Sequence, residues 1–470
     1  MNVQLNDGLT VLGDSVFYGC SQLENIYLPN TITEMGRGIF EDCTLLKSVN
    51  IPHSISYIPE FYLYGCTNIE NITIPENITE IRADAFRGCM NLCNLVIPIT
   101  VRKMCEERTF YGCESLTSIT IPEGIEEIKF DCFNGCKQLK NILIPNTVKT
   151  IGKRAFKDCI SLNKIIFSEN LIKIDGGAFE NCTELVDINI PKSVQEIRQM
   201  VFRNSGYYNN KANWENDILY NGEYLLDVNA NISGDVIVKD SVKHIASLAF
   251  SQCENITGVK LPDGMTHLAD NVFVNCTSLS EVILPSSLEY MKQAVFYNCS
   301  ALKSIVFPDR IKEIGEGVFW GCSSLENVKL PYDLSIIPYY AFNDCANLKS
   351  VVVPNTVKSI DTWAFSGINN DFDIYYTGSE EEWNAIAVGT NNDGLDKATI
   401  HYNSSNYSVG EVTASIDSGE IKEGTVIYLE SPTDGAKIYY TDDGSIPTVQ
   451  SKKYEAGISL SKDTIIKALP

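Results

Sequence analysis

The sequence predicts a β-rich solenoid with a parallel β-sheet on its concave face and short turns or 3₁₀ pieces elsewhere, followed by a small β-sandwich. Three observations predict this fold class: a 23-residue repeat, a short apolar strand pattern in each repeat, and a change of pattern after residue 370. A chain of 470 residues would ordinarily form about three domains. The repeat replaces that expectation, because the coils of a solenoid stack on their neighbours instead of building separate cores.

The repeat is defined by an aromatic column. Phenylalanine recurs at steps of 23 residues, with one step of 24 and one gap of 48 between Phe202 and Phe250, and a leucine fills one slot. The slots are Phe17, Phe40, Leu63, Phe86, Phe110, Phe133, Phe156, Phe179, Phe202, Phe250, Phe273, Phe296, Phe319, Phe342 and Phe365. In most repeats a cysteine follows the slot by three residues and a proline precedes it by eleven. We expect the phenylalanines to stack inward as one spine, because no single coil can bury its own apolar face.

Each repeat also contains one short strand. The segment from Leu139 to Pro145 alternates apolar and polar residues, as a half-buried strand does, and proline ends it. Successive copies can pair in parallel, at about 4.8 Å per strand. The stretch from Ala155 to Cys159 is too short for a helix, so a turn or a 3₁₀ piece is expected there.

The repeat motif A-F-x-x-C-x-x-L-x-x-I-x-I-P resembles that of the BspA-like leucine-rich-repeat family, whose members are mostly bacterial cell-surface proteins. The resemblance covers about residues 1–370, which form the expected leucine-rich-repeat solenoid of about fifteen coils. It implies exposure at a cell surface and a role in adhesion or partner binding. It implies no chemistry.

The repeat is interrupted at residues 203–235. Ile218 to Leu226 is typical of a β-hairpin across an Asn-Gly turn, and we expect a projecting hairpin to replace one coil. Tyr207, Tyr208 and Trp214 lie just upstream and are candidate contact residues, since aromatic side chains on a protrusion can anchor a partner. The alternative is that they cover exposed coil edges.

Two further segments follow the repeats. Residues 371–403 are expected to cap the solenoid, with strands at 374–376 and 398–402 and a short helix opened by the capping box of Ser379 and Glu382. Residues 407–470 resemble the chitobiase C-terminal type of Ig-like β-sandwich, on the strength of GAKIYYTDDGSIPT (435–448) and the final TIIKALP. That module is expected to be truncated, and the chain to be a fragment of a longer secreted precursor whose signal peptide and any anchor lie outside this sequence.

Composition excludes several functions. With 37 Lys and Arg against 60 Asp and Glu, the net charge is −23, which argues against nucleic-acid binding. No apolar stretch approaches the roughly 18 to 20 residues that span a bilayer, so no membrane insertion is expected. No catalytic or metal-ligating constellation occurs, so we expect no cofactor and no enzyme activity.

Two sets of titratable residues, cysteines and histidines, allow either a structural or a functional interpretation. The aligned cysteines lie in a line, which does not provide tetrahedral ligands, and we expect buried free thiols; Cys93, beside a strand, is the best candidate for a reactive thiol. His244 and His267 are one repeat apart in a column with Glu196 and Tyr290. A solvated surface is favoured there over an adventitious metal site or a pH-sensitive patch.

The outward residues of the strands form the candidate ligand-binding face. Its two columns are mostly uncharged and polar or β-branched, and the tentative site consists of Thr120, Asn141, Leu143, Lys164, Ile166 and Asn189. Such a face can accept an extended ligand without desolvating many charges. The alternative is that these residues are merely good strand formers.

The sequence therefore favours a non-enzymatic binding and adhesion protein, extracellular or at the cell surface, that presents this face to a protein partner such as a host matrix or surface protein. The alternative is a carbohydrate-binding accessory or scaffold part of a larger glycan-degrading or cell-wall-associated protein, with a polysaccharide as partner. Sugars usually need aromatic surfaces, and the strand columns offer only Tyr27 and Tyr375, which disfavours the alternative.

Overall fold

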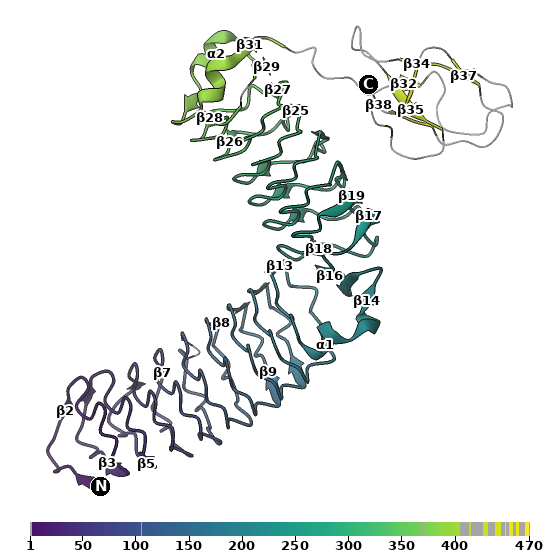
Figure 1. Ribbon diagram of the computed structural model, residues 1–470. Helices are drawn as coiled ribbons and strands as arrows, with labels where there is room; N and C mark the ends of the chain where they lie inside the picture. Colours follow the sequence, from purple (N-terminus) through teal and green to yellow (C-terminus); the bar gives the residue numbers. More distant parts are fainter. Residues whose placement is uncertain are drawn as a thin grey trace.

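The computed structural model describes residues 2–104, 106–368 and 370–404, and short segments between residues 413 and 469. Residues 2–404 form a bent arc of stacked coils (Figure 1). Each coil is one 23-residue turn of the chain and has three sides, two with short strands and one with turns. The expected parallel solenoid is confirmed.

The first strand of each coil comes from the motif that alternates apolar and polar residues. Copies pair in parallel and in register, as Asn141 with Lys164 and Leu143 with Ile166. The strands of this first ladder are β1 (Asn2–Gln4), β3 (Asn25–Tyr27), β5 (Ser48–Val49), β9 (Asn141–Leu143), β11 (Lys164–Ile166), β17 (Ser233–Ile237), β19 (Asn255–Lys260), β21 (Glu281–Ile283), β23 (Ser304–Ile305), β25 (Asn327–Lys329), β27 (Ser350–Val353), β29 (Phe372–Tyr376) and β31 (Ala398–His401). Isolated bridges at residues 71, 94 and 118 continue the ladder between β5 and β9.

A second ladder of two-residue strands follows the proline in each coil. The sequence analysis did not predict it, because a two-residue strand has no alternation to detect. Its members are β2 (Val11–Leu12), β4 (Glu34–Met35), β6 (Tyr57–Ile58), β7 (Glu80–Ile81), β8 (Glu127–Ile128), β10 (Thr150–Ile151), β12 (Lys173–Ile174), β13 (Glu196–Ile197), β18 (His244–Ile245), β20 (His267–Leu268), β22 (Tyr290–Met291), β24 (Glu313–Ile314), β26 (Ile336–Ile337), β28 (Ser359–Ile360) and β30 (Ala387–Val388).

The third side of each coil is the expected turn around the phenylalanine slot. Phe156 N–H donates to the Ala178 carbonyl of the next coil (2.8 Å), so the turns form a hydrogen-bonded ladder of their own. The Phe156 ring is fully buried and lies 5.2 Å from the ring of Phe133 and 5.3 Å from that of Phe179, between centroids. The expected aromatic spine is confirmed.

The cysteine column supports this spine. Cys159 Sγ donates to the Phe133 carbonyl of the preceding coil (3.1 Å), and the same bond recurs along the column. The Phe133 carbonyl also accepts from Cys136 N–H (3.1 Å), so the thiol adds a second hydrogen bond to it. The thiols therefore donate hydrogen bonds to backbone carbonyls, and they pack as small apolar groups.

The segment that interrupts the repeat packs between the coils before and after it. It comprises α1 (Gly206–Asn209), a 3₁₀ turn at Lys211–Asn213, β14 (Trp214–Glu215), β15 (Ile218–Asn221) and β16 (Tyr224–Val228). The expected β15–β16 hairpin is confirmed, but the expectation that it projects is wrong. β16 pairs in parallel with β18, and Leu219 and Leu225 are buried, because an apolar hairpin gains more from packing between coils than from exposure.

The arc bends at this insertion, and the bend corrects the expected position of the first ladder. In Figure 1, β7, β8, β13, β18, β26 and β28 lie on the inner side of the arc, whereas β3, β5, β9, β19, β25 and β27 lie on the outer side with α1 and β14. On the inner side the two halves meet directly, since Ser247 N–H donates to the Ile197 carbonyl (2.9 Å). On the outer side the hairpin adds material between them, so the first ladder is convex and not concave.

Residues 370–404 form the last described coil. Its helix α2 (Glu380–Asn384) carries the predicted capping box: Glu382 N–H donates to Ser379 Oγ, and Ser379 N–H donates to the Glu382 carboxylate. A 3₁₀ turn at Asp393–Lys397 follows, and β30 and β31 add one strand to each ladder. Among the described residues, no helix is long and apolar enough to cross a bilayer.

The described parts of residues 413–469 contain antiparallel strands with a small core of their own. They are β32 (Thr413–Ala414), β33 (Val426–Ile427), β34 (Leu429–Glu430), β35 (Tyr439–Thr441), β36 (Lys452–Lys453), β37 (Ile458–Ser459) and β38 (Lys467–Leu469). β35 pairs with both β36 and β38, and Ile427, Leu429, Ile438 and Ile458 are buried together. Antiparallel pairing agrees with the expected β-sandwich class.

Candidate binding surfaces

The strand face, meaning the outward-facing residues of the first ladder, holds all six residues of the tentative site. Each is exposed. Leu143 pairs with Ile166, and Asn141 pairs with Lys164. Thr120 lies one coil before them and Asn189 one coil after. The structure thus brings the six onto four successive coils, as two neighbouring columns.

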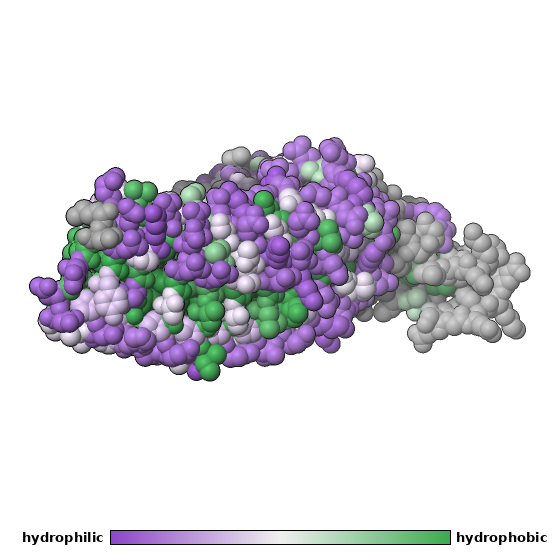
Figure 2. Space-filling view, turned by 90° about the horizontal axis from the view of Figure 1, so that it is seen from below, coloured by the Kyte–Doolittle hydropathy of each residue, from purple (hydrophilic) through white to green (hydrophobic). Residues whose placement is uncertain are grey.

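An apolar stripe runs along this face in the first half. Val96 is 81% exposed, Leu143 60% and Ile166 49%, and each points away from the core in its coil. Figure 2 looks onto the edge where β3, β5 and β9 lie and shows a green band there between purple margins. Near the N-terminal end the face is slightly hollowed around Tyr27. Exposed apolar side chains grouped in this way are typical of interaction surfaces.

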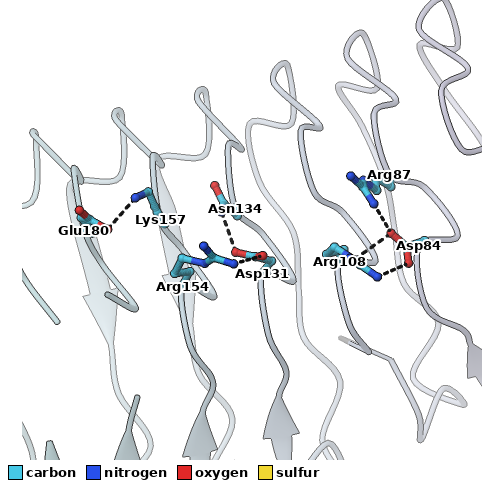
Figure 3. A network of polar contacts seen from close by, with 8 residues as sticks. All are labelled: Asp84, Arg87, Arg108, Asp131, Asn134, Arg154, Lys157 and Glu180. Carbon is cyan, nitrogen blue, oxygen red and sulfur yellow. Dashed lines mark hydrogen bonds and ion pairs between the residues drawn. The ribbon is translucent and has the colours of Figure 1, made fainter. Parts of the chain in front are cut away.

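The turn face, on the third side of the coils, is polar in the first half. Asp84 is 1% exposed and forms ion pairs with Arg87 and Arg108, both 3.2 Å between nitrogen and oxygen. Figure 3 shows two further, separate clusters on later coils: Asp131 with Asn134 and Arg154, and Lys157 with Glu180. These nearly buried carboxylates are paired with arginine, so they leave little free charge for a ligand.

In the last coils of the second half, several of these positions are aromatic, which the sequence analysis missed. Trp320 stacks on Tyr340 at 4.8 Å, and Tyr340 lies 6.3 Å from Trp363, in both cases between ring centroids. Reading the residues one after and two before each phenylalanine slot would have found this column. Because the rings stack on one another along the array, the faces between them are covered, and Trp363 at the end stays 39% exposed.

The three aromatic residues of the insertion have different environments. Tyr207 is buried, and its hydroxyl donates to the Tyr220 carbonyl (2.5 Å). Tyr208 and Trp214 are half-buried and pack edge-to-face at 5.2 Å. Tyr207 thus serves the packing of the insertion, whereas Tyr208 and Trp214 line a hollow at the junction of the two halves.

The cysteine column is buried in its described members, with one exception. Burial raises the pKa of these thiols, for Cys113 to about 12. Cys20, in the first coil, is exposed because no earlier coil covers it, which corrects the expectation of a fully buried column. Cys93 is half-buried, and its Sγ lies 3.5 Å from the Glu70 carbonyl.

The two histidines are stacked on tyrosines. His244 lies on Tyr224 at 5.3 Å and His267 on Tyr290 at 4.7 Å, between ring centroids. Burial lowers the pKa of both imidazoles. The expected neighbour Glu196 is replaced by Tyr224, because β16 inserts before β18. In the part of the chain that the structure describes, no three potential ligands are grouped to hold a metal.

Solved structures of several bacterial proteins are similar to this chain. A leucine-rich repeat protein from Bacteroides ovatus is 24% identical, with 86% of this chain and 92% of that chain covered and a TM-score of 0.43. A leucine rich cell surface protein from Faecalibacterium prausnitzii is 25% identical, covering 82% and 90%, with a TM-score of 0.32. The pneumococcal vaccine antigen PcpA is 17% identical, covering 85% and 90%, with a TM-score of 0.36. No curated protein matches the chain.

Two family models match, and neither describes a catalytic domain. The BspA type leucine rich repeat region, in six copies, matches residues 1–108, 103–226 and 236–371. The chitobiase/beta-hexosaminidase C-terminal domain matches residues 416–470. With most of its length covered by the first of these, the chain belongs to the BspA-type leucine-rich-repeat family.

Proposed function

We propose that this chain is an extracellular, non-enzymatic binding protein that docks a protein partner, such as a host matrix or surface protein, on the strand face of its first half. The apolar stripe of Val96, Leu143 and Ile166 carries the proposal. Exposed apolar groups on a rigid surface are typical of interaction sites, because covering them releases water at no cost in lost hydrogen bonds.

The surroundings of the stripe favour a protein over a small ligand. The face is long and shallow, and a partner would contact several coils at once. Asn141, Thr120 and Asn189 supply neutral hydrogen-bonding groups beside the apolar residues. An apolar centre with a polar rim is the usual arrangement in protein–protein interfaces.

The test is a binding assay of the full chain against immobilised matrix proteins and host surface proteins. Leu143→Glu should weaken a saturable interaction at least tenfold, since it places a carboxylate in the contact. Val306→Glu is the matched control, because Val306 lies in the same column, is 81% exposed and lies beyond the insertion.

If Leu143→Glu and Val306→Glu weaken binding of the partner equally, the contact does not lie on the strand face of the first half. A full panel without any saturable protein binding would refute the proposed function itself.

A further inference from the structure

A hollow of about 540 Å³ lies where the two halves of the solenoid meet. Its walls come from the end of the first half (residues 199–203), from the insertion (208–230) and from the first coil after it (247–252). The volume is in the range of sites that hold small molecules. It is the interruption of the repeat that creates this hollow, since regular coils leave no space between them.

Buried polar groups line this hollow. Ser247 is 3% exposed, and its Oγ has no hydrogen-bond partner among the described residues. The Asp227 carboxylate accepts from Val228 N–H (2.9 Å) and is hydrogen-bonded to the Tyr208 side chain. Burial raises the pKa of Asp227 to about 6. A buried hydroxyl without a partner is costly unless a bound group satisfies it.

Aromatic and amide side chains complete the lining. The Trp214 indole N–H donates to the Tyr208 carbonyl (2.7 Å), which fixes the orientation of the ring at the edge of the hollow. Gln199 and Gln252 also line the hollow. An indole ring beside closely spaced donors and acceptors suits a ligand with both C–H faces and hydroxyl groups.

The charges of the lining are balanced. The lining contains two cations, Arg203 and Lys211, and two carboxylates, Asp217 and Asp227. A strongly anionic ligand would meet the carboxylates, and an apolar one would leave Asp227 and Ser247 unsatisfied. The lining therefore selects a neutral, polyhydroxylated ligand.

We propose that the junction hollow binds a neutral carbohydrate, with Trp214 against a sugar face and Asp227, Arg203 and Ser247 bonded to its hydroxyl groups. This site is separate from the strand face and adds a second ligand class to the proposed function.

The experiment is isothermal titration of the full chain with neutral sugars: glucose, maltose, cellobiose, N-acetylglucosamine and chitobiose. Ser251→Trp should fill the hollow, because Ser251 follows the Phe250 slot and lines the space. Val274→Trp is the matched control at the same position of the next coil, away from the hollow. The position tolerates tryptophan, since Trp320 occupies it two coils later.

We expect at least one of these sugars to bind the wild type and the Val274→Trp variant alike, and the Ser251→Trp variant at least tenfold more weakly. Thermal unfolding of the two variants checks that both are folded. If none of the five sugars binds at 10 mM, or if Ser251→Trp binds like the wild type, the proposal is overturned. Either result leaves protein binding by the strand face untouched.

Discussion

Replacing Phe156 by alanine removes one ring from the middle of the aromatic spine. The ring is fully buried between Phe133 and Phe179, at 5.2 and 5.3 Å. Replacing a buried phenylalanine by alanine costs about 3–5 kcal/mol in unfolding free energy, and lost contacts between stacked rings favour the upper part of that range. Phe156→Ala removes two stacked ring pairs, and the backbone ladders keep the neighbouring coils from closing the gap. We therefore expect the free energy of unfolding to fall by about 4–5 kcal/mol.

The loss of stability in Phe156→Ala should at first be confined to the coils next to the substitution. Phe156 N–H donates to the next coil and Phe133 N–H to the Ala155 carbonyl, so a loosened coil weakens the ladders on both sides. In a quasi-linear array each coil is stabilised chiefly by its neighbours. Hydrogen exchange followed by mass spectrometry should therefore show faster exchange in the coils of Phe133, Phe156 and Phe179, with the coil of Phe319 unchanged.

Phe17→Ala is the matched control. Phe17 lies in the first coil, is only partly buried and stacks on a single ring, that of Phe40 at 5.4 Å. Its replacement should cost about 1–2 kcal/mol. An equal loss in the two variants, or a uniform rise in exchange along the whole array, would refute the reasoning that the spine is held together by nearest neighbours.

Three other perturbations have defined outcomes. Iodoacetamide should modify Cys20 and Cys93 in the folded protein and the buried column only after denaturation, as peptide mass spectrometry can determine; rapid labelling of the column would contradict its burial. Asp84→Asn should lower the free energy of unfolding by about 1–3 kcal/mol in urea titrations, because it weakens two arginine contacts at a buried site. The pKa of Asp227 is raised from 3.8 to about 6, so the folded state binds more protons between these values and the unfolding free energy falls as pH rises through that window. Asp227→Asn should abolish that fall in urea midpoints measured from pH 4 to pH 7.

The regular part of the fold was predictable because it is repeated. A single motif such as Leu139 to Pro145 is a weak signal, but fifteen copies in register leave one way to bury the phenylalanines. The buried thiols followed from the same argument. The exposed Cys20 did not, since a periodic pattern carries no information about its own ends.

The irregular part was predicted less well. The hairpin was visible in its Asn221-Gly222 pair, with Gly222 at a φ of +56°, but its burial depends on what lies on either side. The direction of the bend depends on where the extra residues are placed, which a sequence period does not specify. The six residues on the strand face were placed correctly as outward-facing, whereas the pairing of His244 with Tyr224 required the inserted strand to be seen.

The hydrogen bonds of the array have one further consequence, for how such a protein changes its length. Most inter-coil bonds join residues 22 to 26 apart, as Cys159 with Phe133 and Lys137 with Glu114. Loss or duplication of one 23-residue unit therefore rejoins surfaces that already fit, so recombination between repeats can shorten or extend the array in steps. The insertion is the exception: Arg198 bonds to Asp270 across 72 residues, and that junction can be inherited only as a whole.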